Sequence, residues 1–171
     1  MKSVKRIAIY LTLLMVIMSQ ANFILAQNSK KEKKAKKEAE IKNLVDSQNF
    51  VFKAQTALPM GRRSVNLNSD YDLRVTKEEV VSYLPYYGRA YSTTPGSSNG
   101  LDFTSKDFEY TMKETKKNDG WDIVVKPKDT QLAREMLLTV FKNGSASLQV
   151  TSNDKQNISF SGYVTANKPK K

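Results

Sequence analysis

The sequence predicts a mainly β protein, an antiparallel sandwich or barrel of about seven to nine strands that follows a signal peptide and a basic N-terminal helix. From Asn49 onward, apolar residues recur at every second position, which is the period of strands that bury one face. Turn-forming clusters separate these runs, and the Asn143-Gly144 pair between two of them favours a tight hairpin. The Lys-rich segment before Asn49 has helical spacing instead.

Residues 1 to 26 have the pattern of a signal peptide. Three basic residues precede an apolar run over residues 7 to 18, and small residues follow at Ala21 and Ala26, after either of which cleavage is expected. An uncleaved membrane anchor is the alternative, because the apolar segment has about the 20 residues that a spanning helix needs. Polar residues interrupt the segment near its end, which favours the signal peptide and predicts export to the periplasm or cell envelope.

Residues 27 to 46 form a predicted Lys-rich helical linker. Ile41, Leu44 and Val45 lie on one helical stripe, so we expect only the C-terminal turns of this helix to dock on the domain. The basic turns before them are either a solubilising spacer or a tether that touches an anionic membrane surface.

Residues 47 to 165 carry the alternation and form the predicted antiparallel β-domain, and residues 166 to 171 form a basic tail. We expect strands within residues 50–55, 64–68, 72–76, 80–84, 108–113, 121–126, 132–141, 145–151 and 158–164. The segment 132–141 is denser in apolar residues than the others and is also compatible with a helix. Its position shortly before Asn143-Gly144 favours a central strand covered on both faces.

The composition excludes several functional classes. The 171 residues include no Cys and no His, so no disulfide, thiolate nucleophile, imidazole base or Cys- or His-ligated metal is available. For the same reason the protein is not a cysteine-anchored lipoprotein. The net charge is +11, but residues 47 to 165 hold 15 basic and 13 acidic side chains, so the excess lies in the flanking segments. A basic folded surface is therefore not indicated, and no nucleic-acid partner is expected.

Four blocks of sequence together resemble a known family. They are LVDSQNFVFKAQ at residues 44–55, PMGRRSVNLNSDYDLRV at residues 59–75, VSYLPYYGRAY at residues 81–91 and NISFSGY at residues 157–163. In this combination the chain is similar to the exported bacterial domain-of-unknown-function family DUF4251, over roughly residues 44 to 164. The resemblance implies an exported, envelope-associated bacterial β-domain, and it brings no assigned activity and no catalytic residues.

The segment over residues 59 to 91 holds five of the eight Tyr and four of the six Arg residues of the chain. Tyr rings beside Arg side chains can bind sugars, aromatic ligands or anionic groups. The candidate ligand-binding residues are Tyr86, Tyr87, Arg89 and Tyr91. The alternative is that the rings fill sheet faces, since Tyr is a favoured strand residue. Because Tyr83 shares a strand face with Val81, we expect Tyr83 to be buried and Arg89 to be exposed.

Neither a metal site nor catalytic machinery is predicted. Oxygen-bearing side chains in residues 68 to 72 begin a partial calcium-loop spacing, but Leu73 stands where such a loop needs Gly. Glu78 and Glu79 are neighbours, which on a strand point to opposite faces and cannot act as a catalytic acid and base.

We therefore expect an uncharacterised exported envelope protein whose β-domain is not an enzyme, has no cofactor and serves binding or structure. Its candidate partners are envelope polysaccharide, lipid or another envelope protein. One alternative is a β-barrel that holds a small apolar ligand, since a barrel of about eight strands can enclose one. Another is an envelope hydrolase that uses carboxylates.

Overall fold

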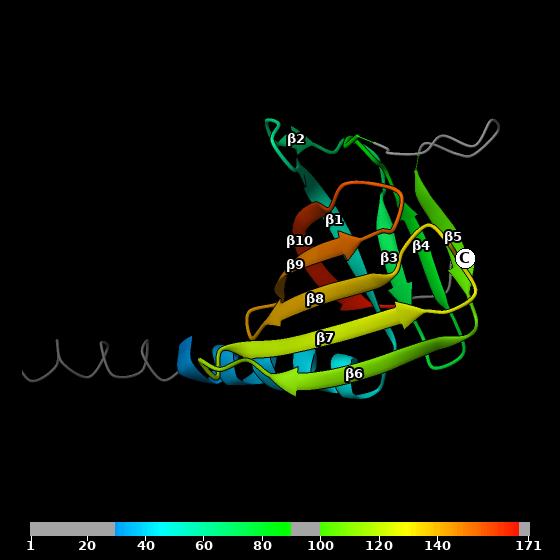
Figure 1. Cartoon of the computed structure of the whole chain (residues 1–171). Coiled ribbons are helices and arrows are strands. Elements are labelled where there is room, and N and C mark those ends of the chain that lie inside the picture. Colours follow the sequence, from blue (N-terminus) through cyan, green and yellow to red (C-terminus); the bar gives the residue numbers. More distant parts are fainter. Residues whose placement is uncertain (1–29, 90–99, 168–171) are drawn as a thin grey trace, which may run out of the picture. The chain divides into compact units, whose positions relative to one another are not determined.

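A computed structural model of the chain describes residues 30–89 and 100–167 (Figure 1). These residues form a helix over residues 30–46 and ten antiparallel strands. The strands are β1 (Phe50–Pro59), β2 (Val65–Asn66), β3 (Asp72–Val75), β4 (Val80–Leu84), β5 (Leu101–Ser105), β6 (Phe108–Glu114), β7 (Gly120–Pro127), β8 (Glu135–Phe141), β9 (Ser145–Thr151) and β10 (Ile158–Ala166). The predicted signal peptide lies outside the described residues, and within them no helix is long and apolar enough to cross a membrane.

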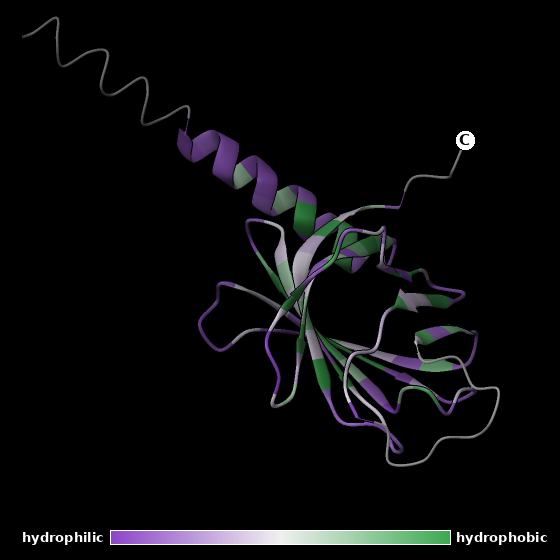
Figure 2. Ribbon diagram, turned by 90° about the horizontal axis from the view of Figure 1, so that it is seen from above, coloured by the Kyte–Doolittle hydropathy of each residue, from purple (hydrophilic) through white to green (hydrophobic). Residues whose placement is uncertain are grey.

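The strands form a single sheet in the order β5-β4-β3-β1-β10-β9-β8-β7-β6, with the short β2 paired to β1. The two edge strands, β5 and β6, follow one another in the chain, and the sheet curls round into a nearly closed barrel (Figures 1 and 2). The predicted mainly β, antiparallel class is confirmed. Of the two predicted architectures the barrel is the correct one, because a sandwich would need two packed sheets.

β1 lies next to the middle of the sheet, between β3 and the central strand β10. The pairing of β1 with β10 changes register between Ala54 and Thr56. Gly162 of β10 faces this irregularity, and a Cβ atom there would collide with the carbonyl oxygen of Lys53. Glycine therefore allows the two central strands to approach at this point, where any larger residue would push them apart.

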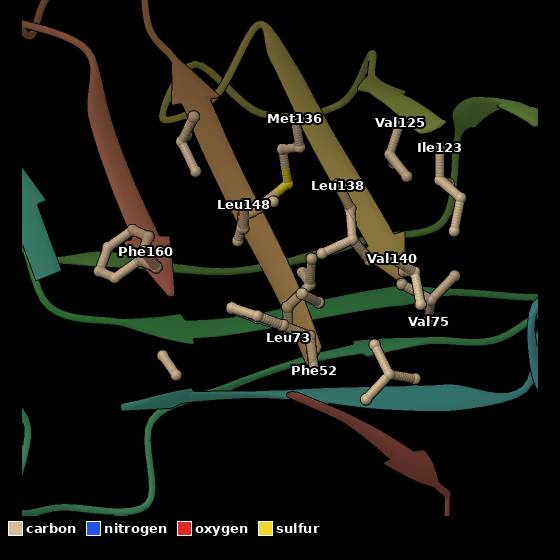
Figure 3. Close-up of a cluster of buried hydrophobic side chains, with 14 of the residues drawn as sticks. Phe52, Leu73, Val75, Ile123, Val125, Met136, Leu138, Val140, Leu148 and Phe160 are labelled. Atoms are coloured by element: carbon tan, nitrogen blue, oxygen red, sulfur yellow. The ribbon is translucent and has the colours of Figure 1, made fainter. Parts of the chain in front are cut away.

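The inward side chains of the sheet form one hydrophobic cluster, part of which Figure 3 shows. Alternate residues of each long strand supply it, as in β7, where Trp121, Ile123 and Val125 are buried. Three pockets lined by described residues open elsewhere, and none of the three includes a member of this cluster. These pockets therefore give no support to the alternative of a barrel that holds an apolar ligand inside.

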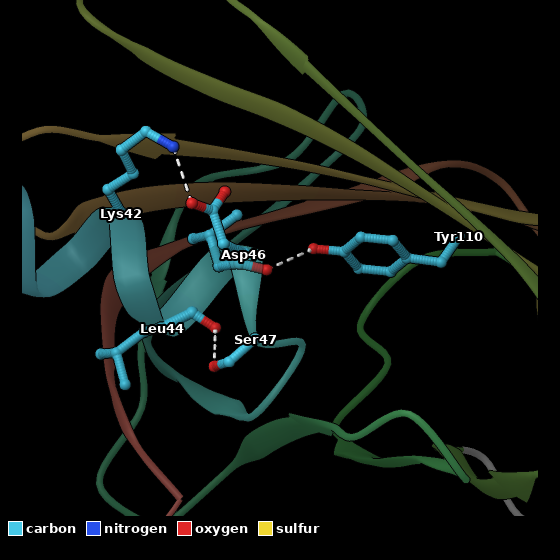
Figure 4. A network of polar contacts seen from close by, with 6 residues as sticks. Lys42, Leu44, Asp46, Ser47 and Tyr110 are labelled. Atoms are coloured by element: carbon cyan, nitrogen blue, oxygen red, sulfur yellow. Dashed lines mark hydrogen bonds and ion pairs between the residues drawn. The ribbon is translucent and has the colours of Figure 1, made fainter.

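The C-terminal turns of the helix dock on the sheet, as the apolar stripe predicts. Ile41 and Val45 have no exposed surface and belong to the core cluster. The Tyr110 hydroxyl on β6 donates a hydrogen bond of 3.2 Å to the carbonyl oxygen of Val45 (Figure 4). The same carbonyl oxygen also accepts from the Gln48 N–H group at 3.1 Å, so Tyr110 adds a second bond to one of the last carbonyl groups of the helix, which have no partner within the helix itself.

The N-terminal turns of the same helix belong to a different compact unit, because the chain divides between Lys37 and Glu38. The side chains of residues 30–37 are exposed, and Figure 2 shows these turns in hydrophilic colours. On the other side of the division, Glu38 Oε1 forms an ion pair of 2.8 Å with Lys142 Nζ, next to the β8–β9 turn. The anchored part of the helix therefore begins with Glu38.

Candidate functional site

Three loops meet beyond the end of β1, at residues 60–64, 85–89 and 152–157. The Tyr86 hydroxyl shares its hydrogen between the carbonyl oxygens of Arg89 and Gln156, at 2.8 and 3.0 Å. The Gln156 N–H group in turn donates to the Arg89 carbonyl oxygen at 3.0 Å. These bonds fix the second and third loops to each other, so the backbone that carries Arg89 is held in place.

Lys155 packs against the Tyr86 ring, next to the contact between the second and third loops. Its side chain is only 6% exposed, and its ammonium group lies 5.2 Å from the centre of the Tyr86 ring. The same group donates to the carbonyl oxygen of Gly100 at 3.2 Å. The cation–π contact and the hydrogen bond stabilise the buried ammonium and orient the Tyr86 ring.

A pocket of about 260 Å³ opens between these loops and is lined by Met60, Gly61, Arg62, Arg89 and Gln156. Gly61 has a φ of 71°, a left-handed conformation that glycine adopts without strain. The tight turn at Gly61 brings Arg62 to the pocket, opposite the loop that carries Arg89.

Arg62 and Arg89 both line this pocket, and no carboxylate of the described residues pairs with either charge. Arg62 Nη1 donates to the carbonyl oxygen of Tyr87 at 3.3 Å, which holds the guanidinium against the loop 85–89. Among the described residues, neither Arg62 nor Arg89 forms an ion pair with Asp or Glu. The described residues that line the pocket also include no acid. Two positive groups therefore face a small space that offers them no negative partner.

Of the four residues predicted to bind a ligand, Tyr86, Tyr87 and Arg89 lie together on the loop 85–89, and Tyr91 lies outside the described residues. Tyr86 and Tyr87 are half-buried and pack against the core cluster. The contacts of Tyr86 are those of a structural residue. Arg89 is exposed, as expected, and lines the pocket.

The expectation that Tyr83 is buried is wrong, because its side chain is 49% exposed. Val80, Ser82 and Leu84 face the core instead, so Tyr83 points to the outer face of β4. Ser82 tolerates this burial because its hydroxyl donates a 2.6 Å hydrogen bond to the carbonyl oxygen of Leu101. Because the small polar residue Ser82 occupies a core position of β4, the alternation of apolar residues along this strand suggests the wrong inward face.

Of the five described residues that line the pocket, the sequence predicts only Arg89 as a site residue, and Met60, Gly61, Arg62 and Gln156 lie outside the predicted set. Arg62 was visible as part of the cationic segment, directly after a Gly turn. No sequence pattern marks Gln156 as a site residue, because its place at the pocket depends on the pairing of β10 with β1, far apart in the sequence.

Other groups of polar side chains offer less to a ligand. A pocket of about 460 Å³ lies on the outer face of β6 and β7, and its charged residues are Glu109, Lys113, Glu114, Lys116, Asp122 and Lys126. Because the two signs are balanced and interspersed, this pocket favours no class of charged ligand. No group of three or more Asp or Glu side chains that could hold a metal ion occurs within the described ranges.

Comparison with known proteins identifies the family. The family model for DUF4251, a domain of unknown function, matches residues 32–164. A crystal structure of a DUF4251 family protein from Bacteroides eggerthii aligns with a TM-score of 0.49 and 14% identity, over 76% of this chain and 87% of that chain. A search of curated proteins found no match. The resemblance seen in the four sequence blocks is confirmed, and the chain belongs to the DUF4251 family.

Proposed function

We propose that this protein is an exported, non-catalytic binding protein of the bacterial cell envelope, and that it holds an anionic group in the pocket between Arg62 and Arg89. The observation that carries this proposal is the pair of guanidinium groups that line one pocket without an acidic partner among the described residues. Export rests on the N-terminal pattern of charge, apolar run and small residues.

The chemistry of the pocket selects the class of ligand. Arginine presents a planar set of donors that matches carboxylate and phosphate groups, and hydrogen bonds between charged groups are the strong ones. Two like charges that face one space repel each other, and an anion between them would turn that repulsion into attraction. Carboxylates of an acidic polysaccharide and phosphates of a lipid headgroup share the required chemistry.

The absence of Cys and His from the chain supports a binding role over a catalytic one. The described residues that line the pocket include no carboxyl group that could serve as a catalytic acid or base; they are Met60, Gly61, Arg62, Arg89 and Gln156. Such a lining can position and neutralise an anion, but it presents no group that readily moves a proton near neutral pH.

Binding measurements with matched arginine variants test the proposal. The probes are polygalacturonate for carboxylates and phosphatidylglycerol vesicles for phosphates, with dextran and phosphatidylcholine vesicles as uncharged counterparts. We expect Arg62→Ala and Arg89→Ala each to weaken binding of one anionic probe by about tenfold or more, the loss typical of a charge-assisted hydrogen bond. The probe that responds tells whether the anion comes from a polysaccharide or a lipid.

Arg63→Ala is the matched control, because Arg63 is exposed, adjacent in sequence and outside the pocket lining. It removes the same charge, so we expect its affinity to stay within about twofold of the parent protein. If Arg63→Ala weakens binding as much as Arg89→Ala does, attraction is a general charge effect and the pocket is not a site. Failure of both anionic probes to bind would also contradict the proposal.

A further inference from the structure

A second surface lies on the outer face of the sheet, away from the arginine pocket. The strand register places Tyr83 of β4, Asp72 of β3, Lys53 of β1 and Tyr163 of β10 opposite one another in one cross-strand row. All four side chains point outward, because their neighbours along each strand belong to the core. We call this set the tyrosine row.

The two tyrosines at the ends of the row are unusually accessible for large side chains. Tyr83 is 49% and Tyr163 44% exposed, and few other large apolar side chains of the described residues are as open. Tyr71, which packs against the core cluster, also contacts Tyr83, since the two ring centres lie 5.3 Å apart with the ring planes tilted by 32°. Three strand separations of about 4.8 Å put the two ends of the row about 14 Å apart.

The middle of the row is polar, and its charges already have partners. Lys53 Nζ lies 2.9 Å from Asp72 Oδ2 and 4.0 Å from Asp70 Oδ1. Asp102, opposite Tyr83 on β5, adds a further exposed carboxylate. The row therefore has an aromatic side chain at each end and hydrogen-bonding groups between them, and with Asp70 and Asp102 it carries more negative than positive charge.

We infer that the tyrosine row binds a neutral saccharide chain. A pyranose ring has an apolar face that can lie on a Tyr ring, and its hydroxyl groups can both donate to Asp72 and accept from Lys53. The carboxylates of this surface repel an acidic polymer. An apolar partner is disfavoured because it would cover the Lys53–Asp72 ion pair and remove it from water, which costs free energy. The separation of the two ends of the row favours an extended chain over a single sugar. This surface is independent of the anion proposed for the arginine pocket.

Titration calorimetry with neutral oligosaccharides tests the inference on the full chain. The probes are maltohexaose, cellohexaose and chitohexaose, and polygalacturonate serves as the acidic comparison. We expect one of the neutral chains to bind, and Tyr83→Ala and Tyr163→Ala each to weaken it by about tenfold, the loss that a stacked aromatic contact gives. Tyr83→Phe, which keeps the ring, should stay within about threefold of the parent protein.

Leu58→Ala is the matched control, because Leu58 is 44% exposed on the neighbouring part of β1 but lies outside the row. Its binding should be unchanged, and thermal melts of each variant confirm that the fold is retained. The inference is overturned if none of the three neutral chains binds at millimolar concentration. It is also overturned if Tyr83→Ala and Tyr163→Ala bind the neutral chains as well as Leu58→Ala does, or if these two substitutions weaken the binding of polygalacturonate more than that of the neutral chains.

Discussion

The two ends of β1 differ in what surrounds them. At Phe50 the strand follows the docked turns of the helix, where Ile41 and Val45 are completely buried and Tyr110 caps a helix carbonyl group. At Pro59 the strand leads into the loop of Arg62, whose charge faces that of Arg89 without an acidic partner among the described residues.

We therefore propose that stability and ligand binding depend on different ends of one strand. Buried apolar side chains contribute the largest single terms to folding, and at the helix end Ile41 and Val45 add to those of the strands. Unpaired charges in a shallow pocket contribute little to folding and remain available to a ligand. Substitutions at the two ends should therefore affect different properties of the protein.

Truncating Ile41 should have the largest effect on stability. Ile41→Ala removes a side chain with no exposed surface and leaves a cavity between helix and sheet, so we expect the free energy of unfolding to fall by about 2–5 kcal/mol. Urea denaturation measures this change. Lys34→Ala, on an exposed turn of the helix, serves as the control and should change stability by less than about 0.5 kcal/mol. Equal effects of the two substitutions would show that the helix does not dock through its apolar stripe.

Removing the Tyr110 hydroxyl should have a smaller effect at the same end. Tyr110→Phe loses the hydrogen bond to Val45 and should cost about 0.5–1.5 kcal/mol at neutral pH. Burial, with a further contribution from the negative charge of Asp46, raises the pKa of Tyr110 well above its usual value. The unfolded chain therefore ionises first, and stability should fall as the pH rises above about 10, the pKa of an exposed tyrosine.

Urea denaturation as a function of pH measures both effects of the Tyr110 substitution. In Tyr110→Phe the alkaline loss should be weaker than in the parent protein, because the group that titrates is gone. An unchanged alkaline profile would show that Tyr110 is accessible to water and does not cap the helix.

A third prediction concerns Asp129, which contacts the β5–β6 turn. The register places Ser105, at the start of this turn, at the same end of the sheet as Phe50. Its carboxylate accepts from the backbone N–H groups of Lys106 and Asp107 at 2.8 and 3.2 Å. A hydrogen bond from Ser105 and these backbone bonds hold the pKa of Asp129 at about 2, below its usual value. A lowered carboxyl pKa stabilises the fold above about pH 4, and this contribution is lost as the pH falls through about 2.

Acid denaturation of Asp129→Asn tests this prediction. The variant should lose less stability than the parent protein between about pH 4 and pH 2, because its side chain does not titrate in that range. Identical acid profiles would show that other carboxylates dominate the acid response.

The smallest effect is expected at the opposite end of β1. Arg62→Ala combined with Arg89→Ala should change the free energy of unfolding by less than about 0.5 kcal/mol, because the pocket buries little apolar surface at these side chains. Removing the repulsion between the two like charges offsets part of the loss of the Arg62 hydrogen bond. Thermal melting measures this change. A loss as large as that of Tyr110→Phe would remove the contrast between the two ends.

Local pattern was enough to predict most of the strands. The alternation in β7 and β9 and the hairpin at Asn143-Gly144 appear as expected, and Gly144 has a φ of 90° there. The apolar segment before that hairpin is a strand, β8, although it begins at Glu135. β5 was missed because its run of five residues is short and follows a stretch rich in Ser and Gly.

The candidate sites were harder to predict, because they depend on pairing between distant strands. Arg89 was singled out from its exposed, aromatic surroundings, but its partners Arg62 and Gln156 come from other loops. The tyrosine row depends on which face of β4 turns inward, and the buried Ser82 concealed that choice. The alternation of side chains along a strand shows which residues share a face, whereas the packing of the whole sheet decides which of the two faces is buried in the core.

The position of β1 between β3 and β10 also has a consequence for the order in which the chain folds. Each of the strands from β6 to β10 pairs with its predecessor or successor, so these hairpins can form from local contacts. The pairing of Phe50 with Ala166 instead closes a loop that contains almost the whole domain. Such closure is slow, because the chain loses conformational entropy before the contacts between the two strands can stabilise it. β1 leaves the ribosome long before β10 is made, so the centre of the sheet stays open throughout synthesis. Until β10 is made, no strand joins β1 and the strands beside it, β3 to β5, to the strands from β6 to β9.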